Sequence, residues 1–206
     1  MHSIENGTNT LQNLLLKVQD QATRAQDFLA PTNQLQLMTG DRGDGTNVSQ
    51  VVIEQSGGMP TQILSANEVA FDQIAQRASI DVRTARRLQQ DYAGEFDALI
   101  NAIWQKEPAV RMLRTFNTGD NVGIARAFVS DKFKTFDNVH LLQSALPQLM
   151  ESDAQWKVVN GEVTDKRLYL RLKSENQTGE GAAVGDVMAN GIGLSNSETG
   201  CGSVNV

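Results

Sequence analysis

The chain has 206 residues, of which 40% are hydrophobic and 20% are charged, a balance that is typical of a globular protein with a sizeable core. No apolar run approaches the roughly 20 residues that a membrane-spanning helix needs, which excludes insertion into a bilayer. One cysteine cannot form an internal disulfide, and two histidines are too few and too scattered for a structural zinc site.

The charge is unevenly spread along the chain. The net charge is −6, yet residues 77–134 carry +3, while residues 1–76 carry −5 and residues 135–206 carry −4. Nucleic-acid binders often concentrate basic residues within an unremarkable total, although solvated helices carry a similar excess. The N-terminus, residues 1–9, lacks the positive start and apolar stretch of a secretory signal, so we expect a cytoplasmic protein with no membrane partner.

An amphipathic helix is predicted over residues 10–29, because apolar residues recur there at three- and four-residue steps until Pro31. We expect residues 1–34 to form a helical arm and residues 35–206 to form a single domain. The apolar stripe packs either on the body of this chain or on a second protomer, as in a homo-oligomer. Its members are Leu11, Leu14, Leu15, Val18, Ala22, Ala25 and Leu29.

A hairpin is predicted next, with strands at 35–38 and 48–54 joined by a turn rich in Gly and Asp. Three helices follow between about residues 65 and 106. The first is expected to begin at a capping box, in which the side chains of Ser65 and Glu68 bond each other's backbone amides.

The other two helices are bounded by clear signals. Asp81 can cap the second helix, and Pro108 follows the end of the third. A second hairpin is predicted from strands at 112–116 and 124–129, and a further helix at 139–150.

Two more strands are predicted at 156–159 and 167–172, around a turn at Asn160-Gly161. In the second of them Leu168, Leu170 and Leu172 alternate with Tyr169, Arg171 and Lys173, so one sheet face should be buried and the other wet. A loop is expected at 176–182, and short strands with turns beyond residue 184. The whole pattern predicts an α+β fold in which helices pack on a largely antiparallel sheet, crossed by the helix at 139–150.

Residues 73–88 resemble a helix-turn-helix, with Ala75 where the helices cross, Ser79 at the tight turn and Ile80 in the core. The alternative is a plain helical hairpin with solvated arginines. The side chains that would face phosphates or bases are Arg83, Thr84, Arg86 and Arg87.

Residues 131–136 interleave Lys132 and Lys134 with two aromatic rings, as single-strand binders do to hold phosphates while stacking bases. In the alternative interpretation the two rings enter the core.

No catalytic constellation is indicated. His140 is the only histidine outside the N-terminal tail, and no phosphate-binding loop or dinucleotide fingerprint is present, so no cofactor is expected. Asp131, Asp137 and Asp186 are the carboxylates that could bind a metal, which leaves a metal-dependent nuclease as a hypothesis.

Two segments carry a family resemblance. Residues 126–138, Arg-Ala-Phe-Val-Ser-Asp-Lys-Phe-Lys-Thr-Phe-Asp-Asn, resemble the first conserved box of the phage/plasmid-like "domain of unknown function 932" family. Gly185-Asp186-Val187, Gly191-Ile192 and residues 195–200 are similar to its second box, and residues 71–75 and 163–169 also fit. The motif residues are Ser130, Asp131, Asp137, Asn138, Ser195, Asn196, Ser197 and Glu198.

The resemblance spans about residues 60–204 and implies a mobile-element context, beside replication and recombination genes of a bacterial host, without an established activity. Family members continue past the second box, so it also implies that this chain is a short version or a fragment. The first box has an architectural interpretation as well, because Asp137 or Asn138 can cap the following helix while Ser130 and Asp131 close the preceding strand.

Three hypotheses follow. The first is a nucleic-acid-binding accessory of phage or plasmid DNA replication or recombination, which binds single- or double-stranded DNA. The second is a protein-interaction module that docks through residues 10–29, and the third is the nuclease. The basic residues expected to contact nucleic acid are Arg83, Arg86, Arg87, Arg126, Lys132 and Lys134.

Overall fold

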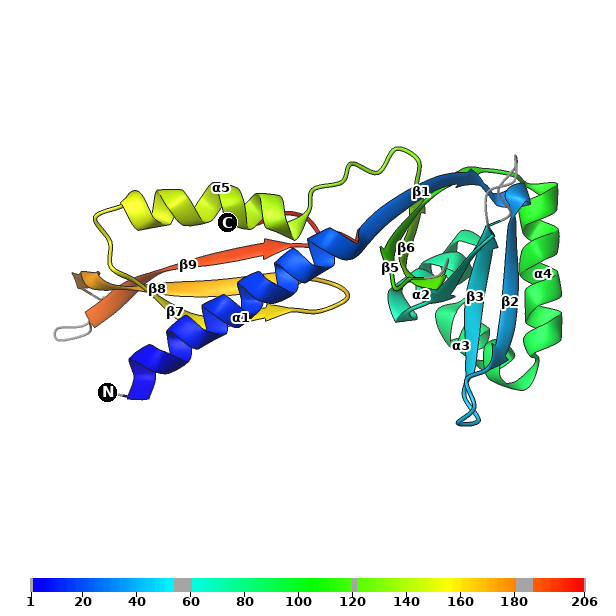
Figure 1. Ribbon diagram of the computed structural model, residues 1–206, viewed down its shortest axis with the longest axis horizontal. Helices are drawn as coiled ribbons and strands as arrows, with labels where there is room; N and C mark the ends of the chain where they lie inside the picture. The colour runs from blue at the N-terminus through cyan, green and yellow to red at the C-terminus, as the bar shows by residue number, and fades with distance from the viewer. Residues whose placement is uncertain (1, 54–60, 120–121, 181–186, 206) are drawn as a thin grey trace. The chain divides into compact units, whose positions relative to one another are not determined.

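The computed structural model describes residues 2–53, 61–119, 122–180 and 187–205 (Figure 1). The predicted α+β class is confirmed: these ranges hold five α-helices and nine strands in two sheets. The chain forms two compact units, a central unit (Arg24–Phe133) and a terminal unit (Met1–Thr23 with Lys134–Val206). This division differs from the predicted arm over 1–34 and single domain over 35–206.

The central unit contains a six-stranded sheet in the order β1-β5-β6-β4-β3-β2. All neighbouring strands are antiparallel except β4 and β6, which run parallel because the helices and β5 lie between them in the chain. Both predicted hairpins are confirmed. The strands are β1 (Ala25–Pro31), β2 (Leu35–Asp41), β3 (Asn47–Ile53), β4 (Gln62–Ala66), β5 (Val110–Asn117) and β6 (Val122–Ser130).

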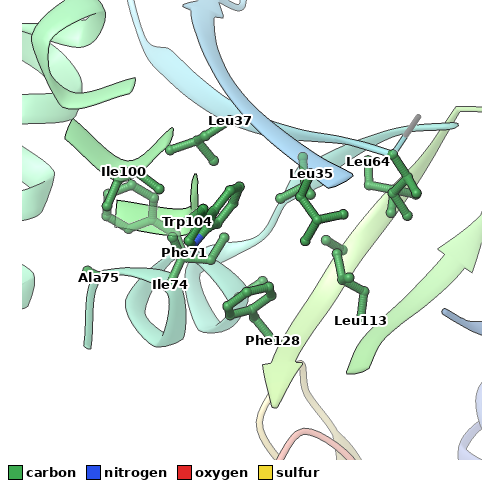
Figure 2. Close-up of a cluster of buried hydrophobic side chains, with 14 of the residues drawn as sticks. Leu35, Leu37, Leu64, Phe71, Ile74, Ala75, Ile100, Trp104, Leu113 and Phe128 are labelled. Carbon is green, nitrogen blue, oxygen red and sulfur yellow. The ribbon is translucent and has the colours of Figure 1, made fainter. Parts of the chain in front are cut away.

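Three helices pack on one face of this sheet and enclose its core (Figure 2). They are α2 (Glu68–Arg77), α3 (Val82–Asp91) and α4 (Ala93–Lys106), and a 3-10 turn, η1 (Thr32–Gln34), joins β1 to β2. The ring of Trp104 stacks on Phe128 of β6 with centroids 5.7 Å apart. The helical trio expected between residues 65 and 106 is therefore present, and its apolar side faces the sheet.

The ends of these helices differ in how well local signals predicted them. Asp81 caps α3, since its carboxylate accepts from the amide of Thr84 at 3.0 Å, as predicted. The capping box at Ser65 was wrong: Ser65 lies in β4, and Asn67 caps α2 by accepting from Ala70. Pairing of β4 with β6 extends the strand through the expected cap and moves the start of the helix.

The predicted helix over 10–29 is wrong beyond residue 24. The helix α1 spans His2–Arg24, and Ala25–Pro31 form β1, which pairs with β5. Phe28 and Ala30 alternate into the core of the central unit, whereas Leu29 points away and is 63% exposed. Strand pairing with a segment about 85 residues away in sequence therefore overrides a helical period.

The outer edge of β2 is closed by side chains of α4. Asn101 accepts from the amide of Leu37 at 2.8 Å and donates to its carbonyl at 3.0 Å. Asp97 accepts from the amide and the hydroxyl of Thr39, although burial raises the pKa of Asp97 above its ordinary value against the lowering effect of those bonds. This covering removes backbone groups with which another strand could pair.

We expect Asn101→Ala to lower the free energy of unfolding by about 1–3 kcal/mol, because it leaves two backbone groups of buried Leu37 unpaired. Urea denaturation measures the change. Gln105→Ala, which removes an exposed bond to Asn33, is the control and should cost less than about 0.5 kcal/mol. Equal losses in the two variants would contradict the edge-closing role of Asn101.

The terminal unit contains a three-stranded antiparallel sheet, in the order β7-β8-β9, with two helices on one face (Figure 1). Leu14 and Val18 of α1 share a core with Leu141 and Leu142 of α5 and with the inward leucines of the sheet. The apolar stripe of α1 thus packs on this chain's own sheet. The elements are α1 (His2–Arg24), α5 (Asn138–Glu151), β7 (Trp156–Val163), β8 (Leu168–Glu180) and β9 (Val187–Asn196).

Two local predictions in this unit were wrong. Asn160-Gly161 is not a turn but lies inside β7 beside a bulge at Val159, and the turn falls at residues 164–167. The predicted loop over 176–182 is strand β8 as far as residue 180, and the rest of it lies outside the described residues. Among the helices that the structure describes, none has both the length and the apolar character needed to cross a bilayer.

Candidate nucleic-acid interface

The arginines of α3 lie at the surface, but two of them already bind carboxylates. Arg86 donates to Asp72 at 2.8 Å, and Arg87 pairs with Asp91 one turn further along α3 at 3.6 Å. Arg83 is exposed at the start of the helix. These pairs fit the helical-hairpin interpretation, in which Ala75 and Ala85 are fully buried and Ser79 forms the turn with a φ of 58°.

Arg126 is not a surface residue. It lies at a bulge in β6, where Arg114 and Thr115 of β5 pair with Ala127 and Ala125 and leave Arg126 between them. Its side chain is 5% exposed, and its guanidinium lies 4.3 Å from the centroid of the Phe116 ring. A residue this buried offers little surface to a phosphate, so the predicted contact at Arg126 does not fit this position.

Lys132 and Lys134 lie on the irregular segment between β6 and α5 and are exposed. Lys132 belongs to the central unit and Lys134 to the terminal unit. Ser130 ends β6, and its hydroxyl oxygen accepts from the amide of Lys132 at 3.0 Å, in agreement with the predicted strand-closing role. The interleaved cations and rings are therefore not on a strand.

The two boxes that carry the family resemblance meet inside the terminal unit. Asp137 is the N-cap residue of α5, and the Glu198 carboxylate accepts from the amide of Asn138 in the first turn. Asn196 donates to the Asn138 side chain at 2.9 Å and to the Phe136 carbonyl at 2.8 Å. These contacts are buried, so the residues hold the start of α5 against the end of β9.

Other residues of the second box form hydrogen bonds with the turn between β7 and β8 or with the C-terminal segment. Ser197 donates to the carbonyl of Lys166 at 2.7 Å, and Thr199 donates to the carbonyl of Asp165 at 3.2 Å. The backbone of Ser195 pairs with Asn205. The second box is therefore architectural where the structure describes it, and Gly185 and Asp186 lie outside the described residues.

Glu198→Ala should lower the free energy of unfolding by about 2 kcal/mol, because it leaves a buried amide at the start of α5 without its acceptor. Glu198→Gln keeps an oxygen acceptor and should lose less than half as much. Thermal and urea denaturation measure both variants. If Glu198→Ala proves neutral, the capping role is refuted.

The carboxylates proposed for a metal fall in different parts of the chain. Asp131 belongs to the central unit and Asp137 to the terminal unit. Asp186 is not among the described residues. Over the described ranges, no group of three or more His, Cys, Asp or Glu side chains could hold a metal ion.

One face of the three-stranded sheet, here called the open face, carries three cross-strand rows of residues, all exposed or partly exposed except Ser195, which is buried at the end of its row. It is the face opposite α1 and α5, because Leu168, Leu170 and Leu172 point to the helices and their neighbours in β8 point away. The first row is Lys157, Lys173 and Gly191. The second is Asn160, Arg171 and Gly193. The third is Glu162, Tyr169 and Ser195.

Two basic groups of the open face have no ion-pair partner among the described residues. Arg171 and Lys173 are exposed, and neither forms an ion pair with a residue that the structure describes. Lys157 pairs with Glu175 at 3.3 Å, yet it also lies directly across from Lys173. Like charges in direct cross-strand positions repel each other, and the carboxylate of Glu175 offsets part of that repulsion.

Glycines on β9 leave the neighbouring cations accessible. Gly191 lies beside Lys173 and Gly193 beside Arg171, and a Cβ placed on Gly193 would meet no atom within 4 Å. Both glycines are exposed. One side of the two cations is therefore flat backbone, which a bound chain could approach closely.

A second basic pair lies in the central unit. Burial lowers the pKa of Arg111, and the positive charge of Arg77 lowers it further, while Asp131 acts in the opposite direction. Arg77 is exposed at the end of α2. Two arginines of the basic segment 77–134 therefore repel each other, Arg77 at its start and Arg111 within it.

The sequence pattern had already placed Tyr169, Arg171 and Lys173 on a wet face, and that prediction is confirmed. It had not marked them as candidate contacts, because β8 lies in an acidic third of the chain, where a count of net charge hides a local row of cations. The useful signal was the alternation itself: two cations and an aromatic ring at every second position of one strand.

Comparisons with known proteins give no match to any family model, curated protein or solved structure. The family resemblance described above therefore stays a prediction.

Proposed function

We propose that this protein binds nucleic acid through the open face of its three-stranded sheet, as an accessory of phage or plasmid DNA replication or recombination. The observation that carries the proposal is the pair Arg171 and Lys173, exposed side by side on β8 without ion-pair partners among the described residues. The family resemblance supports the biological context, and the open face supports the chemistry.

The geometry suits a phosphate backbone. Arg171 and Lys173 are two residues apart on one strand, which separates them by about 7 Å along β8, comparable to the spacing of neighbouring phosphates in an extended strand. Lys157 adds a third cation from β7, directly across from Lys173. An arginine fork and lysine ammonium groups are the side chains that proteins use most for phosphate oxygens.

Removing the two cations of β8 tests the proposal. We expect Arg171→Ala with Lys173→Ala to weaken binding of a labelled single strand about tenfold or more, measured by fluorescence anisotropy at several salt concentrations. Two lost phosphate contacts should also reduce the slope of log affinity against log salt by about 1.4 for a single strand.

The matched control is Arg42→Ala with Lys106→Ala, which removes two exposed positive charges from the central unit. The control should bind within about twofold of the unaltered protein, because its charges do not belong to the proposed site. If the two double variants lose the same binding affinity, the loss reflects the overall charge of the protein, and the open face is refuted as the site.

Lys173→Glu separates stability from binding. It replaces a repulsive cross-strand pair with an attractive one, between the ammonium of Lys157 and the introduced carboxylate, which should raise the free energy of unfolding by about 0.2–1 kcal/mol. The same change should weaken nucleic-acid binding more than Lys173→Ala does. A variant that is less stable, or that binds as well as the unaltered protein, would contradict a functional origin of the lysine pair.

A further inference from the structure

The third row of the open face carries a different chemistry from the other two. Tyr169 is 39% exposed at the centre of the row, and Glu162 lies directly opposite it on β7. Side chains in direct cross-strand positions have Cβ atoms about 5 Å apart, so one ligand group can touch both. Neither side chain forms a hydrogen bond or an ion pair with the residues that the structure describes.

A carboxylate beside the proposed phosphate contacts would repel a backbone phosphate, so Glu162 needs another role. Exposed aromatic rings next to cations are the usual stacking platforms for unpaired bases. A carboxylate at the edge of a stacked base can accept from an exocyclic amino group, as Glu and Asp do with the N4 amine of cytosine. Thymine and uracil present carbonyl oxygens at the corresponding position, and these repel a carboxylate.

We propose that Tyr169 and Glu162 form a base-binding subsite in which Tyr169 stacks an unpaired base and Glu162 accepts a hydrogen bond from its amino group. The ligand is therefore single-stranded nucleic acid, with a preference at this position for a base that carries an amino group, such as cytosine or adenine, over thymine or uracil. The inference rests on the proposed function, because Arg171, next along β8, holds the adjoining phosphate. It adds to that function the type of strand and the class of base that the protein binds.

The order of groups along β8 supports this division. Tyr169, Arg171 and Lys173 follow one another on the same face, so a strand lying along β8 would meet a ring and then two cations. The row of Tyr169 ends at Ser195, whose backbone is already paired with Asn205. An amino group on a stacked base therefore finds its free acceptor on the β7 side, at Glu162.

The test compares 12-nucleotide oligo-dC, oligo-dA and oligo-dT with a duplex of mixed sequence by anisotropy. The unaltered protein should bind oligo-dC and oligo-dA at least fivefold more tightly than oligo-dT. Glu162→Gln should remove most of that preference while keeping the shape of the side chain, because an amide both donates and accepts. Oligo-rC against oligo-rU should show the same preference, since both contacts are made to the base.

Tyr169→Phe should bind like the unaltered protein, whereas Tyr169→Leu should lose about tenfold on every single strand and nothing on the duplex, whose bases are already stacked. Circular dichroism and thermal unfolding of each variant exclude misfolding as the cause. Equal affinity of the unaltered protein for oligo-dC and oligo-dT, or an equal loss on duplex and single strand with Tyr169→Leu, would overturn the subsite.

The failures of the two proposals are distinguishable. If Arg171→Ala with Lys173→Ala weakens binding but no base preference exists, only the subsite is refuted. If that double variant binds as the unaltered protein does, or if no oligonucleotide binds, the open face is refuted together with the subsite.

Discussion

In a β-strand, neighbouring side chains must point to opposite faces. In β8, every second residue therefore belongs to the core of the terminal unit, and the residues between them lie on the exposed face. Leu168, Leu170 and Leu172 are buried against α1 and α5, and they provide much of the apolar area that holds the terminal unit together. The residues between them are thereby forced onto the other face. A shift of register by one residue would bury the cations and expose the leucines, so the core itself fixes the position of Tyr169, Arg171 and Lys173.

The residues that hold the fold and those proposed to bind a ligand are consequently different sets. The boxes that looked most specific in the sequence are largely structural: Glu198 and Asn196 hold the start of α5, and Arg126 lies buried against Phe116. Arg171 and Lys173 on the open face form no ion pair with the described residues, and Lys173 lies directly across from Lys157, which pairs with Glu175. The proposed function therefore rests on these exposed cations and not on the motif residues.

Local signals predicted much of the fold. The cap at Asp81, the hairpin of β5 and β6 and the alternation of β8 were all correct, because each depends on neighbouring residues. The errors fall where distant pairing decides. Residues 25–29 keep a helical period but join β5, and Ser65 carries a capping signal but joins β6 through β4. The open face could not be assembled from sequence either, since its rows depend on the bulge in β7 that restores the register of Asn160 and Glu162.

The proposed function depends most on the place where a single strand binds. A titration followed by 1H–15N NMR locates this binding site directly. With a 12-nucleotide oligo-dC added, the account predicts that amide shifts concentrate on residues 157–162, 169–173 and 191–193, which form the open face. Shifts confined to residues 83–87 of α3, or the absence of any shift in the terminal unit at saturating oligonucleotide, would contradict it.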